Sequence, residues 1–315
     1  MAASSVPVIS NKDFVRSDLL KLPKDIVIVL EDGQIEANKD LLSVRSDLFE
    51  RSFNNPEFIE SQSKSIIMKG CTKAAMRAIV DYIYTGDMDL RNHSLATLLR
   101  IMNFSREILI EDDLFNRIEA FLRDLLTVNS SESIANFLKR IADSSRISGV
   151  STATDLMKCP VLVEGFRLDN LRESVFRFTS ATILMIVNYR EKKQKVSAVV
   201  KDNVSLMGER MMSEFMQLPH RIVKDLLMFD HGPHNLNFFK IMGYTKTKFS
   251  MFAAWFSVNE DNCTVEEKNE ILKSFHYSDF TGEELVKVVG RSGLFTKEAV
   301  EDMVIERLNQ YEERQ

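Results

Sequence analysis

The chain is poor in cysteine, with only Cys71, Cys159 and Cys263 among its 315 residues. They are odd in number and far apart, and they form no CxxC pair. This spacing gives no disulfide framework and no start for a zinc site. We therefore expect reduced thiols in a reducing compartment, no metal and no cofactor.

Long apolar runs are also missing. The longest, 26–30 and 181–187, fall far short of the ~20 residues that a membrane-spanning helix needs. The first eight residues lack the basic and apolar regions of a signal peptide. We expect a cytoplasmic or nuclear protein, or one found in both places, that does not contact a membrane.

Signals for catalysis and for nucleic-acid binding are scarce. The net charge of −5 provides no positive field to attract nucleic acid. Eleven glycines form neither a P-loop nor a G-x-G-x-x-G motif. No carboxylate or cysteine stands at metal-ligand spacing beside His220, His231 and His234. The sequence therefore favours a protein that is not an enzyme and does not bind nucleic acid directly.

Strand patterns occur in the first third of the chain. Residues 26–30 are apolar throughout, which predicts a strand buried on both faces. Asp32-Gly33 favours a type I′ hairpin turn into a second strand at 34–37. Residues 65–68 predict a third short strand.

Helical patterns surround these strands and fill the rest of the chain. Ser46 is placed to cap a short helix, and a strong helix runs from Thr72 to a C-terminal Gly86. Thr264 with Glu267 and Thr281 with Glu284 fit capping boxes. Residues 149–200 fit poorly, because Ser, Thr and Gly cluster at 148–154 and Pro160 interrupts the pattern.

This order of elements resembles the BTB/POZ family. The segments that carry the resemblance are Asp25 to Val29, Ala37 to Leu42, Arg45 to Phe49 and Ile79 to Gly86. The last segment is the most specific, because it ends a helix with Tyr-Ile-Tyr-Thr-Gly. The chain departs from the family pattern at Asn38, where the family usually has histidine.

The C-terminal portion resembles the BACK region that often follows a BTB domain. The matching segments are 218–227, 249–255 and 285–295. The resemblance implies an α/β (α+β) BTB/POZ domain followed by an all-α BACK-like helical region. An N-terminal segment with a dimerisation helix is expected at 1–24, and the BTB/POZ domain at 25–126. The BACK-like region is expected at 127–315, with a possible insertion at 149–200.

The function implied by the resemblance is protein interaction without catalysis. A homodimer would act as an adaptor that bridges a cullin-3 ubiquitin ligase scaffold to an unidentified protein target. The alternative is a BTB scaffold or transcriptional co-regulator that works without a cullin.

Two sets of residues follow from the resemblance. Phe58-Ile59-Glu60 matches an apolar-x-Glu element that resembles the cullin-3 contact of BTB adaptors, although Phe58 could instead anchor an ordinary loop. The expected cullin-binding residues are Phe53, Phe58 and Glu60. The expected dimer interface contains Phe14, Val15, Leu19, Leu22, Asp25 and Arg45.

The dimer residues leave alternatives open. The helix that carries Phe14 is too short to be stable alone, so it packs either on a second copy or on its own domain. Asp25 and Arg45 would form a carboxylate–guanidinium pair near the interface. Otherwise, Asp25 ends a turn and Arg45 faces water.

Overall fold

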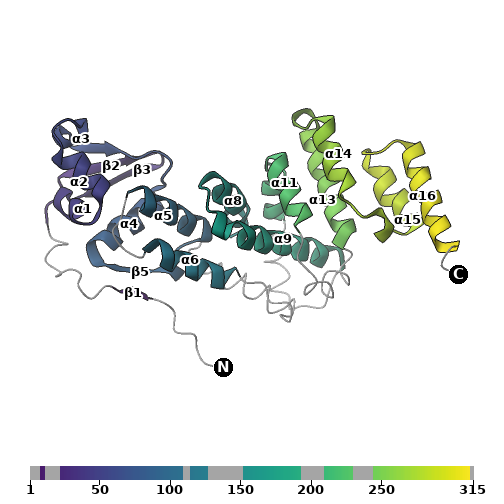
Figure 1. Ribbon diagram of the computed structural model, residues 1–315, viewed down its shortest axis with the longest axis horizontal. Coiled ribbons are helices and arrows are strands. Elements are labelled where there is room, and N and C mark those ends of the chain that lie inside the picture. Colours follow the sequence, from purple (N-terminus) through teal and green to yellow (C-terminus); the bar gives the residue numbers. More distant parts are fainter. Residues whose placement is uncertain are drawn as a thin grey trace, which may run out of the picture. The chain divides into compact units, whose positions relative to one another are not determined.

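The computed structural model describes residues 8–10, 22–108, 114–126, 152–192, 209–229 and 244–312. These residues belong to two compact units, whose elements are labelled in Figure 1. The first unit contains the described elements up to α8 and the start of α9, as far as Ser174, and the described part of the second begins at Val175. The first unit is a small sheet with helices, and the described part of the second is mostly helical, as expected for the fold class.

A three-stranded sheet lies in the first unit. Its strands are β2 (Ile26–Leu30), β3 (Gly33–Ala37) and β4 (Ser65–Ile67), in the order β3-β2-β4. β3 pairs antiparallel with β2, and β4 pairs parallel with it. Every second side chain of β2 is buried and the others are half-buried. The sheet therefore has one face on the core, whereas the sequence predicted burial on both faces.

The hairpin turn lies one residue earlier than predicted. Leu30 pairs with Gly33, so Glu31 and Asp32 form the turn. Gly33 has φ = 147°, a conformation that L-residues rarely adopt. Asp32 Oδ1 accepts a hydrogen bond from the Lys73 N–H at 2.7 Å. The Asp32 side chain thus accepts a hydrogen bond from the first residue of the helix that begins at Lys73. The two residues are 41 positions apart, so local sequence could not reveal this interaction.

Helices make up most of the first unit. They are α1 (Lys39–Arg45), α2 (Asp47–Asn54), α3 (Ile59–Gln62), α4 (Lys73–Thr85), α5 (Leu95–Glu107), α6 (Leu114–Leu125) and α8 (Thr152–Gly165). A short ladder joins β1 (Val8–Ser10) to β5 (Asp87–Asp89), and a 3₁₀ turn (Leu90–Asn92) follows it. The sequence did not predict β1 or β5, because neither three-residue strand carries an apolar run like the one at 66–68 that marked β4.

The predicted helix ends are confirmed by their hydrogen bonds. Ser46 Oγ accepts from the Phe49 N–H at the start of α2. Gly86 ends α4 in the left-handed region at φ = 69°, and its N–H donates to the Tyr82 carbonyl at 2.7 Å. Glycine adopts this conformation without the steric cost of a Cβ atom.

Tyr84 links α4 to the start of α1. Its hydroxyl accepts a hydrogen bond from the Asn38 N–H at 2.6 Å, and both residues are buried. Asn38 Oδ1 also caps α1 by accepting from the Leu41 N–H, and its Nδ2 donates to the Pro23 carbonyl at 2.8 Å. The Asn38 side chain thus stabilises two places at once, the segment at Pro23 that precedes β2 and the start of α1.

Replacing Tyr84 by phenylalanine is expected to destabilise the first unit. The buried Asn38 N–H would lose its acceptor, which costs about 1–3 kcal/mol of the free energy of unfolding. Urea denaturation followed by circular dichroism measures this change. Asn38→Ala is the matched variant, because it removes the cap but keeps the main-chain bond to Tyr84. An unchanged urea midpoint in Tyr84→Phe would contradict the assignment.

The described part of 149–200 contributes to the packed interior, and its being an insertion stays a prediction. α8 packs on α5, and α9 (Asp169–Lys192) follows it. The buried side chains of α8 and α9 include Leu156, Cys159, Leu171, Val175, Phe176, Ile183 and Leu184. Two buried hydroxyls of α9 have partners, since Thr182 Oγ1 donates to the Phe178 carbonyl and Ser180 Oγ to the Leu226 carbonyl. The Ser- and Thr-rich composition did not indicate this burial. These two hydroxyl groups can leave water because backbone carbonyls accept their hydrogen bonds.

Helices also build the second unit. Besides the rest of α9 and a helical stretch at 209–215, they are α11 (His220–Met228), α13 (Tyr244–Asn259), α14 (Val265–Lys273), α15 (Gly282–Glu284) and α16 (Lys297–Glu312), with short 3₁₀ and π turns between the last four. Both predicted capping boxes are confirmed, at Thr264/Glu267 and at Thr281/Glu284. Trp255 and Phe249 of α13 lie at the centre of an aromatic core. Within the described residues, no helix is long and apolar enough to cross a membrane.

Candidate protein-interaction site

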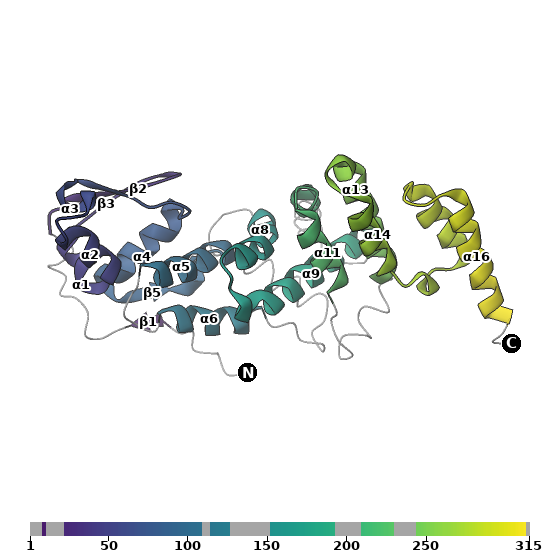
Figure 2. The ribbon, with the colours of Figure 1, turned by 45° about the horizontal axis from the view of Figure 1, so that its top comes forward.

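The segment between α2 and β4 turns sharply before it presents its apolar residues. The turn is made by Asn55, whose Oδ1 accepts from the Glu57 N–H at 3.0 Å and whose carbonyl accepts from the Phe58 N–H at 3.1 Å. α3 begins directly after Phe58 and lies beside α2 (Figures 1 and 2). The asparagine turn therefore determines where Phe58 emerges.

Phe58 and Ile59 present apolar surface on this segment. The side chain of Phe58 is 47% exposed and that of Ile59 is 84% exposed, while Glu60 is half-buried. Exposed large apolar side chains next to each other are typical of protein interaction sites. The sequence predicted Phe58 and Glu60 as contact residues but not Ile59, which only the exposed fraction of its side chain identifies as part of the surface.

Phe53 does not share this exposure. Its side chain is 8% exposed, and its ring stacks on that of Phe49 with the centroids 5.6 Å apart. Lys39 Nζ lies 5.4 Å from the Phe53 ring centroid. Phe53 therefore supports the segment from the core, and we do not carry it forward as a direct contact.

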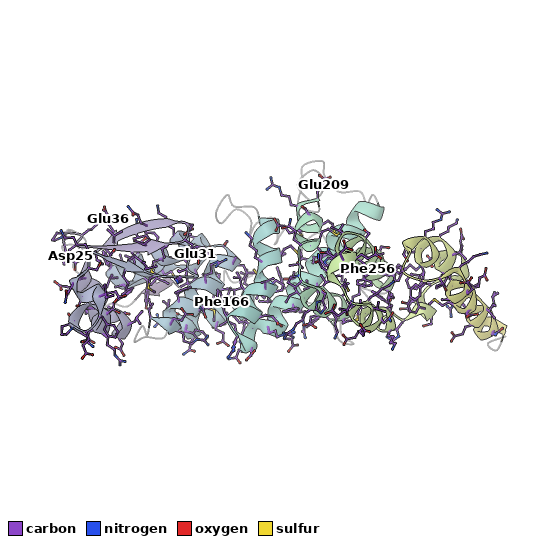
Figure 3. All side chains as sticks on the ribbon, turned by 90° about the horizontal axis from the view of Figure 1, so that it is seen from above. Asp25, Glu31, Glu36, Phe166, Glu209 and Phe256 are labelled. Carbon is purple, nitrogen blue, oxygen red and sulfur yellow. The ribbon has the colours of Figure 1, made fainter. Side chains whose placement is uncertain are left out.

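The predicted dimer residues are only partly described. Phe14, Val15 and Leu19 lie outside the described residues. Leu22 is exposed just ahead of the sheet. Asp25 precedes β2 (Figure 3), and its Oδ1 accepts from the Lys39 N–H at 2.8 Å.

Arg45 is the last residue of α1 and is half-buried, and its neighbour Val44 is strongly exposed. The pairing of Asp25 with Arg45 stays a prediction. Val44 adds an exposed apolar side chain to the same end of α1, a residue that the sequence analysis did not select.

Chemical reactivity is low at Cys71, the buried cysteine that follows β4 in the sequence. Burial raises the pKa of the Cys71 thiol to about 12, so the thiol stays protonated at neutral pH. In the part of the chain that the structure describes, no group of three or more His, Cys, Asp or Glu side chains could hold a metal ion. The exposed apolar side chains of Phe58 and Ile59 are the feature of this surface that is suited to binding a partner.

Comparison with known proteins identifies the first unit. Residues 18–124 match the family model of the BTB/POZ domain. The chain therefore carries a BTB/POZ domain, followed by a mostly helical C-terminal region.

The chain is similar to several curated BTB proteins. It is 37% identical to human Rho-related BTB domain-containing protein 2 over 62 residues, which cover 20% of this chain and 8% of that protein. It is 26% identical to mouse Kelch-like protein 36 over 137 residues, 41% of this chain and 21% of that protein. It is 32% identical to human Kelch-like protein 3 over 75 residues, which cover 24% of this chain and 13% of that protein. The match thus spans less than a quarter of each relative's length.

Proposed function

We propose that the chain is a non-catalytic, homodimeric adaptor that bridges a cullin-3 ubiquitin ligase scaffold to a protein target. The observation that carries this proposal is the exposed Phe58–Glu60 segment between α2 and β4 of a BTB/POZ domain. Similarity to Kelch-like proteins supports an adaptor or protein-interaction role. Such an adaptor performs no chemistry, and it acts by raising the effective concentration of the target near the ligase.

Each residue of the segment has a distinct part in the proposed contact. Phe58 supplies an apolar side chain that enters a pocket on cullin-3, and Ile59 adds apolar area beside it. Glu60 supplies a carboxylate, which accepts hydrogen bonds from the partner or from its own loop. An aromatic anchor with a polar neighbour matches the composition of interaction hot spots.

The proposed dimer surface lies around the start of the domain. It combines Leu22, Asp25 and Arg45 with Phe14, Val15 and Leu19 of the preceding segment. The exposed Val44 would extend the same surface along α1. Burial of these apolar side chains against a second copy would supply the main driving force for association.

Light scattering of the chain alone and mixed with cullin-3 tests both parts of the proposal. The chain alone is expected to show about twice the 36.2 kDa chain mass, because each copy covers the other's apolar surface. Added cullin-3 is expected to raise the mass by one cullin per chain. A monomer mass would contradict dimerisation. A dimer that takes up no cullin-3 would favour the cullin-independent scaffold instead.

A further inference from the structure

α3 has few anchors of its own. It is four residues long, none of them is buried, and no side chain caps its N-terminus. Its internal bonds are local: the Phe58 carbonyl accepts from the N–H and the hydroxyl of Ser61, and the Ile59 carbonyl accepts from the Ser63 N–H. A single helical turn is not stable in water without outside support. Some contact from elsewhere in the domain must hold it.

Lys39 supplies that contact. It is the first residue of α1, and its ammonium group donates to the Ser63 carbonyl at 2.9 Å and to the Ser61 carbonyl at 3.5 Å. These carbonyls lie at the C-terminal end of α3, where a positive charge also interacts favourably with the helix dipole. Among the described residues, these are the side-chain hydrogen bonds that reach 59–63 from outside 55–65.

The lysine is itself held in place. Its backbone N–H donates to Asp25 Oδ1 at 2.8 Å, and its side chain lies over the Phe53 ring, so it is half-buried. Hydrogen bonds hold Lys39 at its backbone N–H and at its ammonium group, so its side chain links α1 to α3. The ammonium group binds at the C-terminal end of α3, just beyond the residues that carry the exposed apolar surface.

We propose that Lys39 is a positioning residue that holds α3 in the geometry needed to present Phe58, Ile59 and Glu60 to the partner. The proposal rests on the proposed cullin-3 contact. Lys39 does not touch the partner; it acts through the carbonyls of Ser61 and Ser63. A role in overall stability alone would leave the local order of α3 and the partner affinity unchanged relative to the rest of the domain.

Three variants of the full chain separate these roles. Lys39→Met keeps the length and apolar stem of the side chain but removes its donors. Lys39→Arg keeps a charged donor, and its guanidinium group can still stack on the Phe53 ring. Lys64→Met removes the same charge from the same segment, at an exposed side chain that makes no hydrogen bond or ion pair with the described residues.

Amide hydrogen exchange at Ser61 and Ser63 and calorimetric titration with cullin-3 are the two readouts. In Lys39→Met, exchange at both amides is expected to accelerate about tenfold and cullin-3 affinity to fall about tenfold, as for the loss of a charge-assisted hydrogen bond. Lys39→Arg and Lys64→Met are expected to behave like the wild type in both measurements. Thermal unfolding confirms that each variant is folded. Should Lys39→Met fail to fold, Lys39→Gln takes its place.

Unchanged exchange at Ser61 and Ser63 in the variant would overturn the proposal, and so would faster exchange with unchanged cullin-3 affinity. Failure of the proposed function has a different signature. In that case the wild type itself shows no cullin-3 binding, while the exchange measurement still decides whether Lys39 holds α3.

Discussion

Replacing Phe58 and Glu60 together by alanine is expected to weaken binding of cullin-3 by about 100-fold or more. Phe58 is 47% exposed, so a substantial part of its ring surface is available for transfer from water into a partner pocket. Truncation of a central aromatic anchor costs roughly 2 kcal/mol or more. Loss of a charge-assisted hydrogen bond to Glu60 costs a further 1.5–3 kcal/mol or so. Since every ~1.4 kcal/mol is tenfold in affinity, the sum exceeds two powers of ten.

The fold should tolerate this double change. None of the α3 residues is buried, and Phe58 makes only local hydrogen bonds through its backbone. We expect the thermal midpoint and the dimer mass to stay at their wild-type values. Isothermal titration calorimetry against cullin-3 gives the affinity of both proteins.

A matched control uses the same chemistry elsewhere on the domain. Glu57→Ala with Ile67→Ala removes one carboxylate from the same loop and one exposed apolar side chain from β4. This control is expected to bind cullin-3 as the wild type does. If the double variant of Phe58 and Glu60 keeps wild-type affinity, cullin-3 is bound elsewhere and the contact residues are wrong.

Replacing Trp255 by alanine is expected to have the largest effect on stability. The indole is 2% exposed and stacks on Phe252, with the ring centroids 6.2 Å apart. Its Nε1 donates to the Leu218 carbonyl at 3.0 Å, which links α13 to the start of α11. Removing a buried tryptophan leaves a large cavity and costs about 3–5 kcal/mol of the free energy of unfolding.

Urea denaturation followed by circular dichroism measures this loss, because Trp255 is the only tryptophan and its removal abolishes the fluorescence signal. Trp255→Phe retains most of the ring packing and separates the contribution of the hydrogen bond. Val258→Ala, at an exposed position of the same helix, should change stability by less than about 0.5 kcal/mol. An equal, small effect of all three changes would show that α13 is not central to the second unit.

Local chemistry was enough to predict several elements from the sequence. A continuous apolar run identified β2, and glycine after Thr85 identified the end of α4, because only glycine enters the left-handed region without steric cost. The capping box of Thr264 and Glu267 is likewise complete within four residues. Such signals are short-range, so the sequence contains all of their participants.

The candidate site could be predicted only in outline. The order of motifs located Phe58 and Glu60 between a helix and a strand. It could not distinguish the buried Phe53 from the exposed Phe58, because both are aromatic residues beside a break. It also passed over Ile59 and Lys39, whose roles depend on exposure and on carbonyl groups more than twenty residues away.

The sequence alone determined the class of the protein through its resemblance to a family. It also determined the order of the first elements and the helix ends, since these depend on neighbouring residues. Tertiary structure decided the rest. The parallel pairing of β4 with β2, the turn at Glu31 and Asp32 and the burial of the hydroxyl-rich α9 all involve groups distant in the chain. The hydrogen bond from Lys39 to the end of α3 is a further feature that only the tertiary structure decides, because a bond between distant residues leaves no local pattern in the sequence.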